Sequence, residues 1–229
     1  MCSSNPISLE FSLKYDRKHA EQYLKKHQDG MARRLSHWRD VQLARRALKQ
    51  AGDPGVVLDL PCGAGRFWPL LADKSDRVIM AADNSSDMIS IALAGQPADI
   101  VKRVDAFQTS AFSIDLVGGA VDCIFCMRLL HHISDSRHRI ALLREFYRVS
   151  RDTVIVSLWV DGNYKAFRRW RLEKTRVINE GGEKNRNRFI VQKRVIEAEF
   201  KQAGFVIAGH YDFLPGYAMW RVYTLRKMI

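Results

Sequence analysis

Long apolar runs and cysteines are scarce in this chain of 229 residues, and each scarcity excludes a class of protein. No run reaches the roughly 18 consecutive apolar residues of a bilayer-spanning helix, so we expect no membrane span. The N-terminus has no apolar stretch behind a basic start, and no secretory signal is therefore expected. The four cysteines lack the regular spacing of a disulfide framework, which favours a reducing, cytoplasmic compartment.

Two of these cysteines, Cys123 and Cys126, have the C-x-x-C spacing found in many metal and redox sites. They lie inside the apolar run VDCIFCM, however. A zinc site would need two more ligands, and a redox pair usually opens a helix. We therefore expect two buried residues on a strand and no metal site.

Acidic residues are also few, 25 against 37 basic residues, which gives a net charge of +12. The excess is concentrated in residues 12–50 and 161–194, each with eleven basic and four acidic residues, whereas the rest of the chain is nearly neutral. A local basic excess is typical of proteins that contact an anionic partner, such as nucleic acid, a phosphorylated glycolipid or a membrane surface. Solvated helix faces would show the same pattern.

Short β-branched runs alternate with helical patterns through most of the chain. Strands are predicted at residues 55–61, 77–83, 98–106, 121–127 and 152–160, with helices between them. This alternation predicts an α/β fold, a doubly wound and mostly parallel sheet. After a helix closed by Gly204, two runs separated by Pro215-Gly216 predict a hairpin, which gives a seven-stranded sheet with an antiparallel C-terminal strand.

The chain is expected to form a single domain with two appendages. Residues 1–51 are predicted as an N-terminal helical cap with helices at 12–28 and 31–51, and residues 52–160 as a cofactor-binding core. Residues 161–190 form a basic, aromatic insertion, predicted as a helix followed by a loop. Residues 191–229 carry the last helix and the hairpin.

The sharpest motif is VVLDLPCGAGRF, which joins a buried strand to a turn containing Gly63 and Gly65 and then to a helix start. Such a turn lets a ligand approach the backbone closely. Asp83 follows at the end of the next strand, where an acid binds ribose hydroxyls. Trp68 stands where a dinucleotide fingerprint has its third glycine, and Asp59 would repel a pyrophosphate. The pattern favours S-adenosylmethionine, which carries an ammonium and a sulfonium, over NAD.

The motif resembles motif I of the class I, Rossmann-like S-adenosylmethionine-dependent methyltransferases, with Pro61 in place of the first glycine. AADNSSDMI, VDAF and CMRLLHHI resemble the motifs that follow it in this family. The resemblance implies Asp83 on the ribose, Met88 near the adenine, and Asp105 with Ala106 at the adenine edge. The cofactor-binding residues that it implies are Asp59, Pro61, Gly63, Gly65, Asp83, Asn84, Met88, Asp105, Ala106, Cys126 and Met127.

His131 and His132 follow the fourth strand and are the candidate general bases, because imidazole accepts protons near neutral pH. They could instead hold the loop by hydrogen bonds. Arg128 in the same segment could meet an anionic acceptor or lie on the surface. No Asn-Pro-Pro-aromatic motif follows this strand, so amino methylation of nucleic acids ranks lower. Pyrimidine C5 methylation also ranks lower, because Cys62 belongs to the cofactor loop and Cys126 at the strand end is not preceded by proline.

The sequence therefore predicts methyl transfer, preferably to oxygen, on a small or lipid-linked anionic acceptor. A nucleic-acid methyltransferase and a non-catalytic cofactor-binding scaffold remain alternatives. The N-terminal helices and the insertion are expected to roof the acceptor pocket, and peripheral membrane contact is compatible with their charge. The aromatic residues Tyr164, Phe167 and Trp170 are equally consistent with a helix that packs on the sheet.

Overall fold

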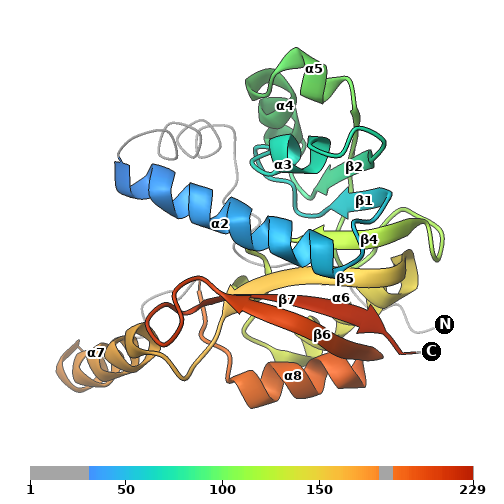
Figure 1. Cartoon of the computed structure of the whole chain (residues 1–229). Coiled ribbons are helices and arrows are strands. Elements are labelled where there is room, and N and C mark those ends of the chain that lie inside the picture. Colours follow the sequence, from blue (N-terminus) through green and yellow to red (C-terminus); the bar gives the residue numbers. More distant parts are fainter. Residues whose placement is uncertain (1–30, 181–187, 229) are drawn as a thin grey trace.

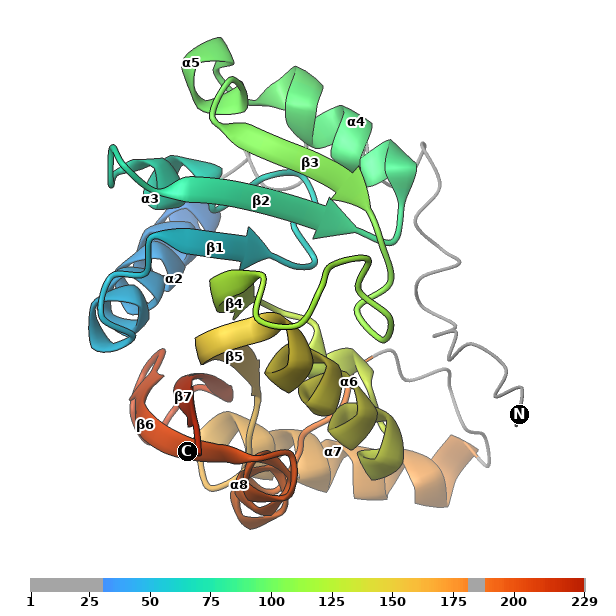
Figure 2. The same cartoon turned by 90° about the vertical axis from the view of Figure 1, so that its right-hand side faces the viewer.

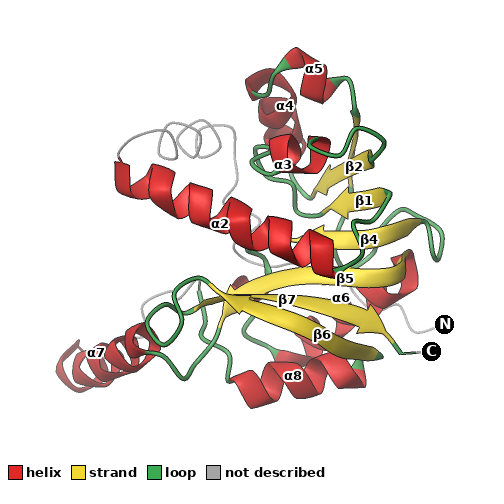
Figure 3. Ribbon diagram, viewed as in Figure 1, coloured by secondary structure: helices red, strands yellow, loops and turns green. Residues whose placement is uncertain are grey.

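A seven-stranded, mostly parallel sheet forms the centre of the molecule (Figures 1 and 3). The computed structural model describes residues 31–180 and 188–228. The strands are β1 (Val56–Asp59), β2 (Val78–Asp83), β3 (Val104–Gln108), β4 (Val121–Cys126), β5 (Ser150–Trp159), β6 (Phe205–Asp212) and β7 (Trp220–Lys227). Their order is β3-β2-β1-β4-β5-β7-β6, with β1 to β5 parallel and β7 antiparallel to both of its neighbours. The predicted sheet, with its antiparallel C-terminal strand, is confirmed.

Helices cover both faces of this sheet, as Figure 2 shows. They are α2 (Met31–Gln50), α3 (Trp68–Ala72), α4 (Ser86–Gly95), α5 (Ala98–Val101), the 3-10 turn η2 (Leu130–His132), α6 (Ser136–Val149), α7 (Tyr164–Glu180) and α8 (Lys193–Gln202). The apolar side of α2 packs with Val57 and Phe125, whereas α6 and α8 pack with Leu58 and Ile124 on the other face. Because strand side chains alternate between faces, a central strand buried on both sides needs a continuous apolar run.

The same alternation explains the C-x-x-C pair. Cys123 packs in the cluster under α2, and Cys126 packs in the cluster under α6 and α8. Both side chains are fully buried. Their separation of three residues places them on opposite faces of the sheet. The prediction of two buried strand residues is confirmed, and the two sulfurs cannot ligate one metal.

The predicted strand at 98–106 is wrong in its first half. Residues 98–101 form the short helix α5, which begins directly after Pro97, and strand β3 starts only at Val104. Pro97 is the N-cap of this helix, and its carbonyl oxygen accepts hydrogen bonds from the Ile100 and Val101 amides. Only five residues pair with β2, from Ile79 opposite Val104 to Asp83 opposite Gln108. The β-branched residues before Val104 predicted a longer strand, but β2 has no residues that pair with them.

The predicted helix boundaries hold well elsewhere. Ser85 caps α4 by accepting a hydrogen bond from the Met88 amide, and Asp135 caps α6 in the same way. Gly204, with φ of +96°, closes α8. The helix predicted at 31–51 is α2 and the inserted helix is α7, whereas the helix predicted at 12–28 lies outside the described residues.

Two helices extend beyond the carboxyl ends of the parallel strands. In Figure 1, the N-terminal half of α2 and the whole of α7 project on the side toward which the arrowheads of β1 and β4 point. In doubly wound sheets, ligands bind in the crevice at this edge. None of the described helices is both long and apolar enough to cross a bilayer.

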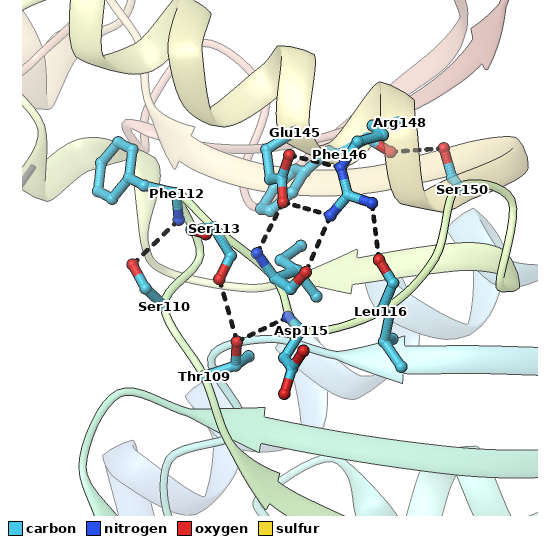
Figure 4. Close-up of polar contacts among 11 residues, drawn as sticks. Thr109, Ser110, Phe112, Ser113, Asp115, Leu116, Glu145, Phe146, Arg148 and Ser150 are labelled. Atoms are coloured by element: carbon cyan, nitrogen blue, oxygen red, sulfur yellow. Dashed lines mark hydrogen bonds and ion pairs between the residues drawn. The ribbon is translucent and has the colours of Figure 1, made fainter. Parts of the chain in front are cut away.

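The loop between β3 and β4 is fixed by the C-terminal part of α6 (Figure 4). Glu145 accepts a hydrogen bond from the Ile114 amide at 2.7 Å, and Arg148 donates to the carbonyl oxygens of Ile114 and Leu116. The hydrogen bond from Arg148 is the main reason that the pKa of Glu145 lies below its usual value. This ionised pair therefore holds the loop against the C-terminal end of α6.

Candidate cofactor and acceptor site

The glycine loop after β1 adopts a conformation that only glycine accepts readily. Gly63 and Gly65 have φ of +53° and +70°. A Cβ on Gly65 would come within 2.8 Å of the Trp68 ring, which is fully buried. Trp68, which stands in place of a third glycine, thus packs against the turn itself. Substitution of Gly65 would displace this ring and distort the loop.

Asp83 lies at the carboxyl end of β2, as predicted, and is tied to the glycine loop. Its Oδ2 accepts a hydrogen bond from the Gly63 amide at 2.9 Å, and its Oδ1 accepts one from the Ser85 amide at 3.0 Å. Burial raises the pKa of Asp83, and these amide hydrogen bonds oppose that effect. A carboxylate oxygen can accept two hydrogen bonds, so each Asp83 oxygen can still accept one from a ligand hydroxyl.

Asp59, at the end of β1, is a buried acid with an unsatisfied oxygen. Its Oδ2 and the nearby Trp68 Nε1 both lack a well-aligned hydrogen-bond partner among the described residues. Burial, followed by the charge of Asp83, raises the pKa of Asp59 well above its usual value. A buried polar atom without a partner is costly. A ligand carrying an amino group would satisfy it.

The remaining predicted cofactor residues divide into two groups. Met88 is buried beside Gly63, Pro61 and exposed Asn84 lie in the loops after β1 and β2, and Cys126 and Met127 are buried at the end of β4. Asp105 was expected at a strand end, with Ala106 next to it, and this position is wrong. Asp105 is the second residue of β3 and is exposed, and the strand continues to Gln108.

Gln108 is a residue that the sequence reasoning missed. It ends β3 opposite Asp83, and its Nε2 donates to the Asn84 carbonyl oxygen at 2.9 Å. It therefore links the carboxyl ends of β2 and β3, next to the predicted ribose position. The motif VDAF directed attention to an acid three residues earlier, because the strand boundary at this edge was misplaced.

The two histidines of η2 have different surroundings. His131 is 1% exposed, stacks on Trp159 with ring centroids 5.2 Å apart, and meets the edge of Trp220 at 4.8 Å. Desolvation, with the nearby cations as a smaller cause, lowers the pKa of His131 to about 2. Such a ring resists the protonation that a general base must undergo. His132 is only half-buried, so the geometry favours it over His131 as a base.

Arg128 joins the segment after β4 to the N-terminal helix rather than lying free on the surface. Asp40 of α2 is buried and pairs with both Arg128 and Arg66, the residue after the glycine loop. His37, one turn earlier, accepts a hydrogen bond from Arg66. Asp40 thus ties α2 to both the glycine loop and the histidine segment, a connection that helical periodicity alone did not indicate.

Two further arginines, Arg169 of α7 and Arg188, gather around Trp159. Their guanidinium carbons lie 5.0 and 5.6 Å from its ring centroid. Both arginines line a cavity of about 820 Å³ between the first half of α7 and the chain around residues 188–192. The Phe189 amide, in the same wall, donates to the His131 carbonyl oxygen at 2.7 Å. The cavity wall is therefore bonded directly to the histidine turn.

Charge in this cavity is only partly compensated. Glu173 accepts a hydrogen bond from Arg169 at 3.0 Å, and Asp161 accepts one from the Lys193 amide at the start of α8. Among the described side chains, those of residues 31–173 and 188–228, no carboxylate forms an ion pair with Arg188. A guanidinium that lies over an aromatic ring can still donate from its edge. The cavity can therefore bind an anionic group, and its wall is bonded to the histidine turn.

Comparison with known proteins agrees with this fold. Residues 57–153 match the family model described as "Methyltransferase domain". A 113-residue segment is 26% identical to the tRNA (carboxymethyluridine(34)-5-O)-methyltransferase alkbh8 of Xenopus tropicalis; the match covers 48% of this chain but only 16% of the frog protein.

Solved structures share the fold at low sequence identity. Magnesium protoporphyrin IX methyltransferase of Synechocystis, with bound S-adenosylhomocysteine, superposes with a TM-score of 0.74 and 17% identity over 95% of this chain and 98% of that protein. The [4+2]-cyclase SpnF superposes with a TM-score of 0.64 and 17% identity, covering 82% and 81% of the two chains. The fold by itself therefore does not specify the reaction. The chain therefore has the fold of class I methyltransferases, and its residues 57–153 match a methyltransferase domain.

Proposed function

We propose that the chain methylates an oxygen atom of a small or lipid-linked anionic acceptor. The observation that carries this proposal is a cavity whose wall holds Arg169 and Arg188 and is hydrogen-bonded, through the Phe189 amide, to the turn that contains His132. A half-buried imidazole can remove a hydroxyl proton, and an arginine without an acidic partner can hold an anion. The segment after β4 reads Cys-Met-Arg-Leu, which lacks the prolines of amino-methylating nucleic-acid enzymes.

The residues at the ends of β1 and β2 suit the cofactor. Asp59 would pair with the amino group, Asp83 would accept hydrogen bonds from the ribose hydroxyls, and Met88 would pack near the adenine. Gly63 and Gly65 keep the loop free of side chains where the ligand approaches. When bound, S-adenosylmethionine supplies a methyl group on a sulfonium that is already activated for displacement.

The chain's own residues would then position the acceptor and take its proton. His132 accepts the hydroxyl proton, which leaves oxygen as the nucleophile, and Arg188 holds the anionic part of the acceptor. Arg139 supports this segment, because its guanidinium donates to the carbonyl oxygens of Ile133 and Ser134 directly after His132.

Replacement of Asp59 by asparagine is expected to stabilise the ligand-free protein while weakening cofactor binding. Because the folded-state pKa of Asp59 is raised, ionisation costs stability once the pH exceeds the unfolded value of about 3.9, and the full cost applies above the folded value. Neutral asparagine removes this cost. The gain in melting temperature should therefore shrink toward zero as the pH falls to about 4. Calorimetry should show S-adenosylhomocysteine binding weakened by about 1–3 kcal/mol.

Asp122→Asn is the matched control, and its expected effect on stability has the opposite sign. Burial raises the pKa of Asp122, but hydrogen bonds from the Val56 amide and Arg151 outweigh it, and the net pKa is lowered. Its ionised form therefore adds stability above the unfolded pKa. The control should melt earlier than wild type at neutral pH and bind S-adenosylhomocysteine normally. Unchanged affinity in Asp59→Asn would refute the assignment to the amino group.

A ribonucleic acid acceptor is the second candidate, because the frog relative is a tRNA methyltransferase and this chain is strongly basic. The proposal is tested with tritiated S-adenosylmethionine and a cell extract separated into lipid, small-molecule and RNA fractions. We expect label in the lipid or the anionic small-molecule fraction, and Arg188→Gln should raise the KM for that acceptor with less effect on kcat. Label confined to RNA would overturn the proposal in favour of the second candidate.

A further inference from the structure

Exposed apolar side chains gather on the two helices that project at the cofactor edge. On α2, Met31, Leu35 and Trp38 are 87%, 65% and 55% exposed, and their spacing places them on one stripe of the helix. On α7, the exposed large apolar residues are Tyr164, Phe167, Trp170 and Leu172, and the loop between β6 and β7 adds Leu214 and Tyr217.

The loop and α7 form one continuous surface. The Tyr164 and Lys165 amides donate to the Gly216 and Tyr217 carbonyl oxygens, and the rings of Tyr164 and Tyr217 stack with centroids 5.7 Å apart. In the first turns of α7, Ala166 is buried whereas Phe167 and Trp170 are about half exposed. A helix with so little of its apolar surface covered presents that surface to a partner.

The charges on these exposed segments have one sign. Arg33 and Arg34 are exposed on α2, and Lys165, Arg168 and Arg171 are exposed on α7. No acidic residue occurs in residues 31–39 or 164–172. Glu173, the first acid of α7, already pairs with Arg169. Cations interleaved with apolar side chains are complementary to a surface that is anionic outside and apolar beneath.

Exposed aliphatic side chains distinguish between the two kinds of anionic partner, a lipid surface and a nucleic acid. Aromatic rings with arginines would also suit stacked nucleic-acid bases. Met31, Leu35 and Leu172, however, have no ring to stack on a base, and each is at least half exposed. Such side chains gain free energy by entering an apolar phase. The combination therefore favours a lipid surface over RNA.

We propose that the N-terminal half of α2, the first half of α7 and the β6–β7 loop dock the protein on an anionic lipid bilayer, with the cofactor edge facing the membrane. This proposal rests on the proposed lipid-linked acceptor and names where that acceptor is found. The helices lie on the side toward which the strands β1 and β4 point, so docking would bring the cavity beside Arg188 to the headgroup level (Figure 1).

Sedimentation of the full chain with vesicles tests the proposal. Binding is expected to vesicles of phosphatidylcholine with phosphatidylglycerol, to be weak on phosphatidylcholine alone, and to decline with salt. The paired variants Leu35→Ser with Trp38→Ser, and Phe167→Ser with Trp170→Ser, should each lower the partition coefficient by about tenfold or more. The control pair Val78→Ser with Val206→Ser removes comparably exposed residues elsewhere and should leave binding unchanged.

The outcomes separate this proposal from the proposed function. All variants should bind S-adenosylhomocysteine like wild type, which shows that they fold. An equal loss of vesicle binding in the control pair, or no preference for anionic vesicles, would overturn the proposed docking surface. Loss of RNA retention rather than vesicle binding in the α2 and α7 variants would assign the surface to nucleic acid instead. Label in a lipid fraction without vesicle binding would leave methyl transfer standing and reject the docking.

Discussion

Replacing Glu199 with alanine is expected to lower the free energy of unfolding by about 3–5 kcal/mol, the cost of breaking a buried ion pair from one side. Glu199 of α8 accepts hydrogen bonds from Arg139 at 2.6 and 2.8 Å, and side-chain exposure is only 4% and 5% for the two residues. Ser136 donates to the same carboxylate at 2.6 Å. The alanine variant would leave the Arg139 charge buried without its counterion. Urea denaturation should show a lower midpoint at an unchanged slope.

The exposed pair of Asp152 with Arg226 provides the control. Both side chains are nearly half exposed, so Asp152→Ala should cost less than about 1 kcal/mol. Glu199→Ala should also reduce methyl transfer, because Arg139 holds the carbonyl oxygens that follow His132. Equal destabilisation by the two variants would show that burial does not strengthen the Arg139–Glu199 pair.

Replacing His132 with alanine is expected to reduce kcat by about 10²- to 10⁴-fold, the usual contribution of a general base. Cofactor affinity should not change, because the residues proposed to hold the cofactor lie at the ends of β1 and β2. In wild type the rate should fall on acidification, because a protonated imidazole cannot accept the acceptor's proton. This pH dependence should be lost in the variant. Initial rates across pH and S-adenosylhomocysteine calorimetry measure the two effects separately.

Three matched variants distinguish a base from a structural role. His132→Gln keeps hydrogen-bonding capacity but cannot act as a base, so it should remain as inactive as the alanine variant. His138→Ala, on α6 beside Phe112, should retain full activity. His131→Ala removes a ring packed between two tryptophans and should lower stability more than turnover. Restored activity in His132→Gln would reject general-base catalysis by this residue.

Local sequence patterns predicted most of the framework. The apolar runs at β1, β2, β4 and β5, the caps at Ser85 and Asp135, and the hairpin at the end of the chain were all readable, because each depends on neighbours within a few residues. The failure at β3 has the same origin. Residues 98–106 have strand propensity, but Pro97 starts a helical turn and the pairing with β2 begins only at Val104.

The glycine turn and its acids were likewise determined by the sequence, since Gly63, Gly65, Asp59 and Asp83 lie at strand ends that the alternation locates. Asp83 lies at the strand end where it was predicted, whereas Asp105 was misplaced with its strand. The sequence therefore determined where the residues of the proposed cofactor site lie, apart from Asp105 and Ala106.

Only the tertiary structure decided the arrangement of the proposed acceptor site. His131 and His132 are equivalent in any pattern, yet the turn of η2 buries one ring between Trp159 and Trp220 and leaves the other half-buried. Arg188 packs on the Trp159 ring, although the whole of α7 separates the two residues in the sequence. Periodicity tells which face of an element is buried but not which distant residue it meets, because contacts between far segments depend on how whole elements pack.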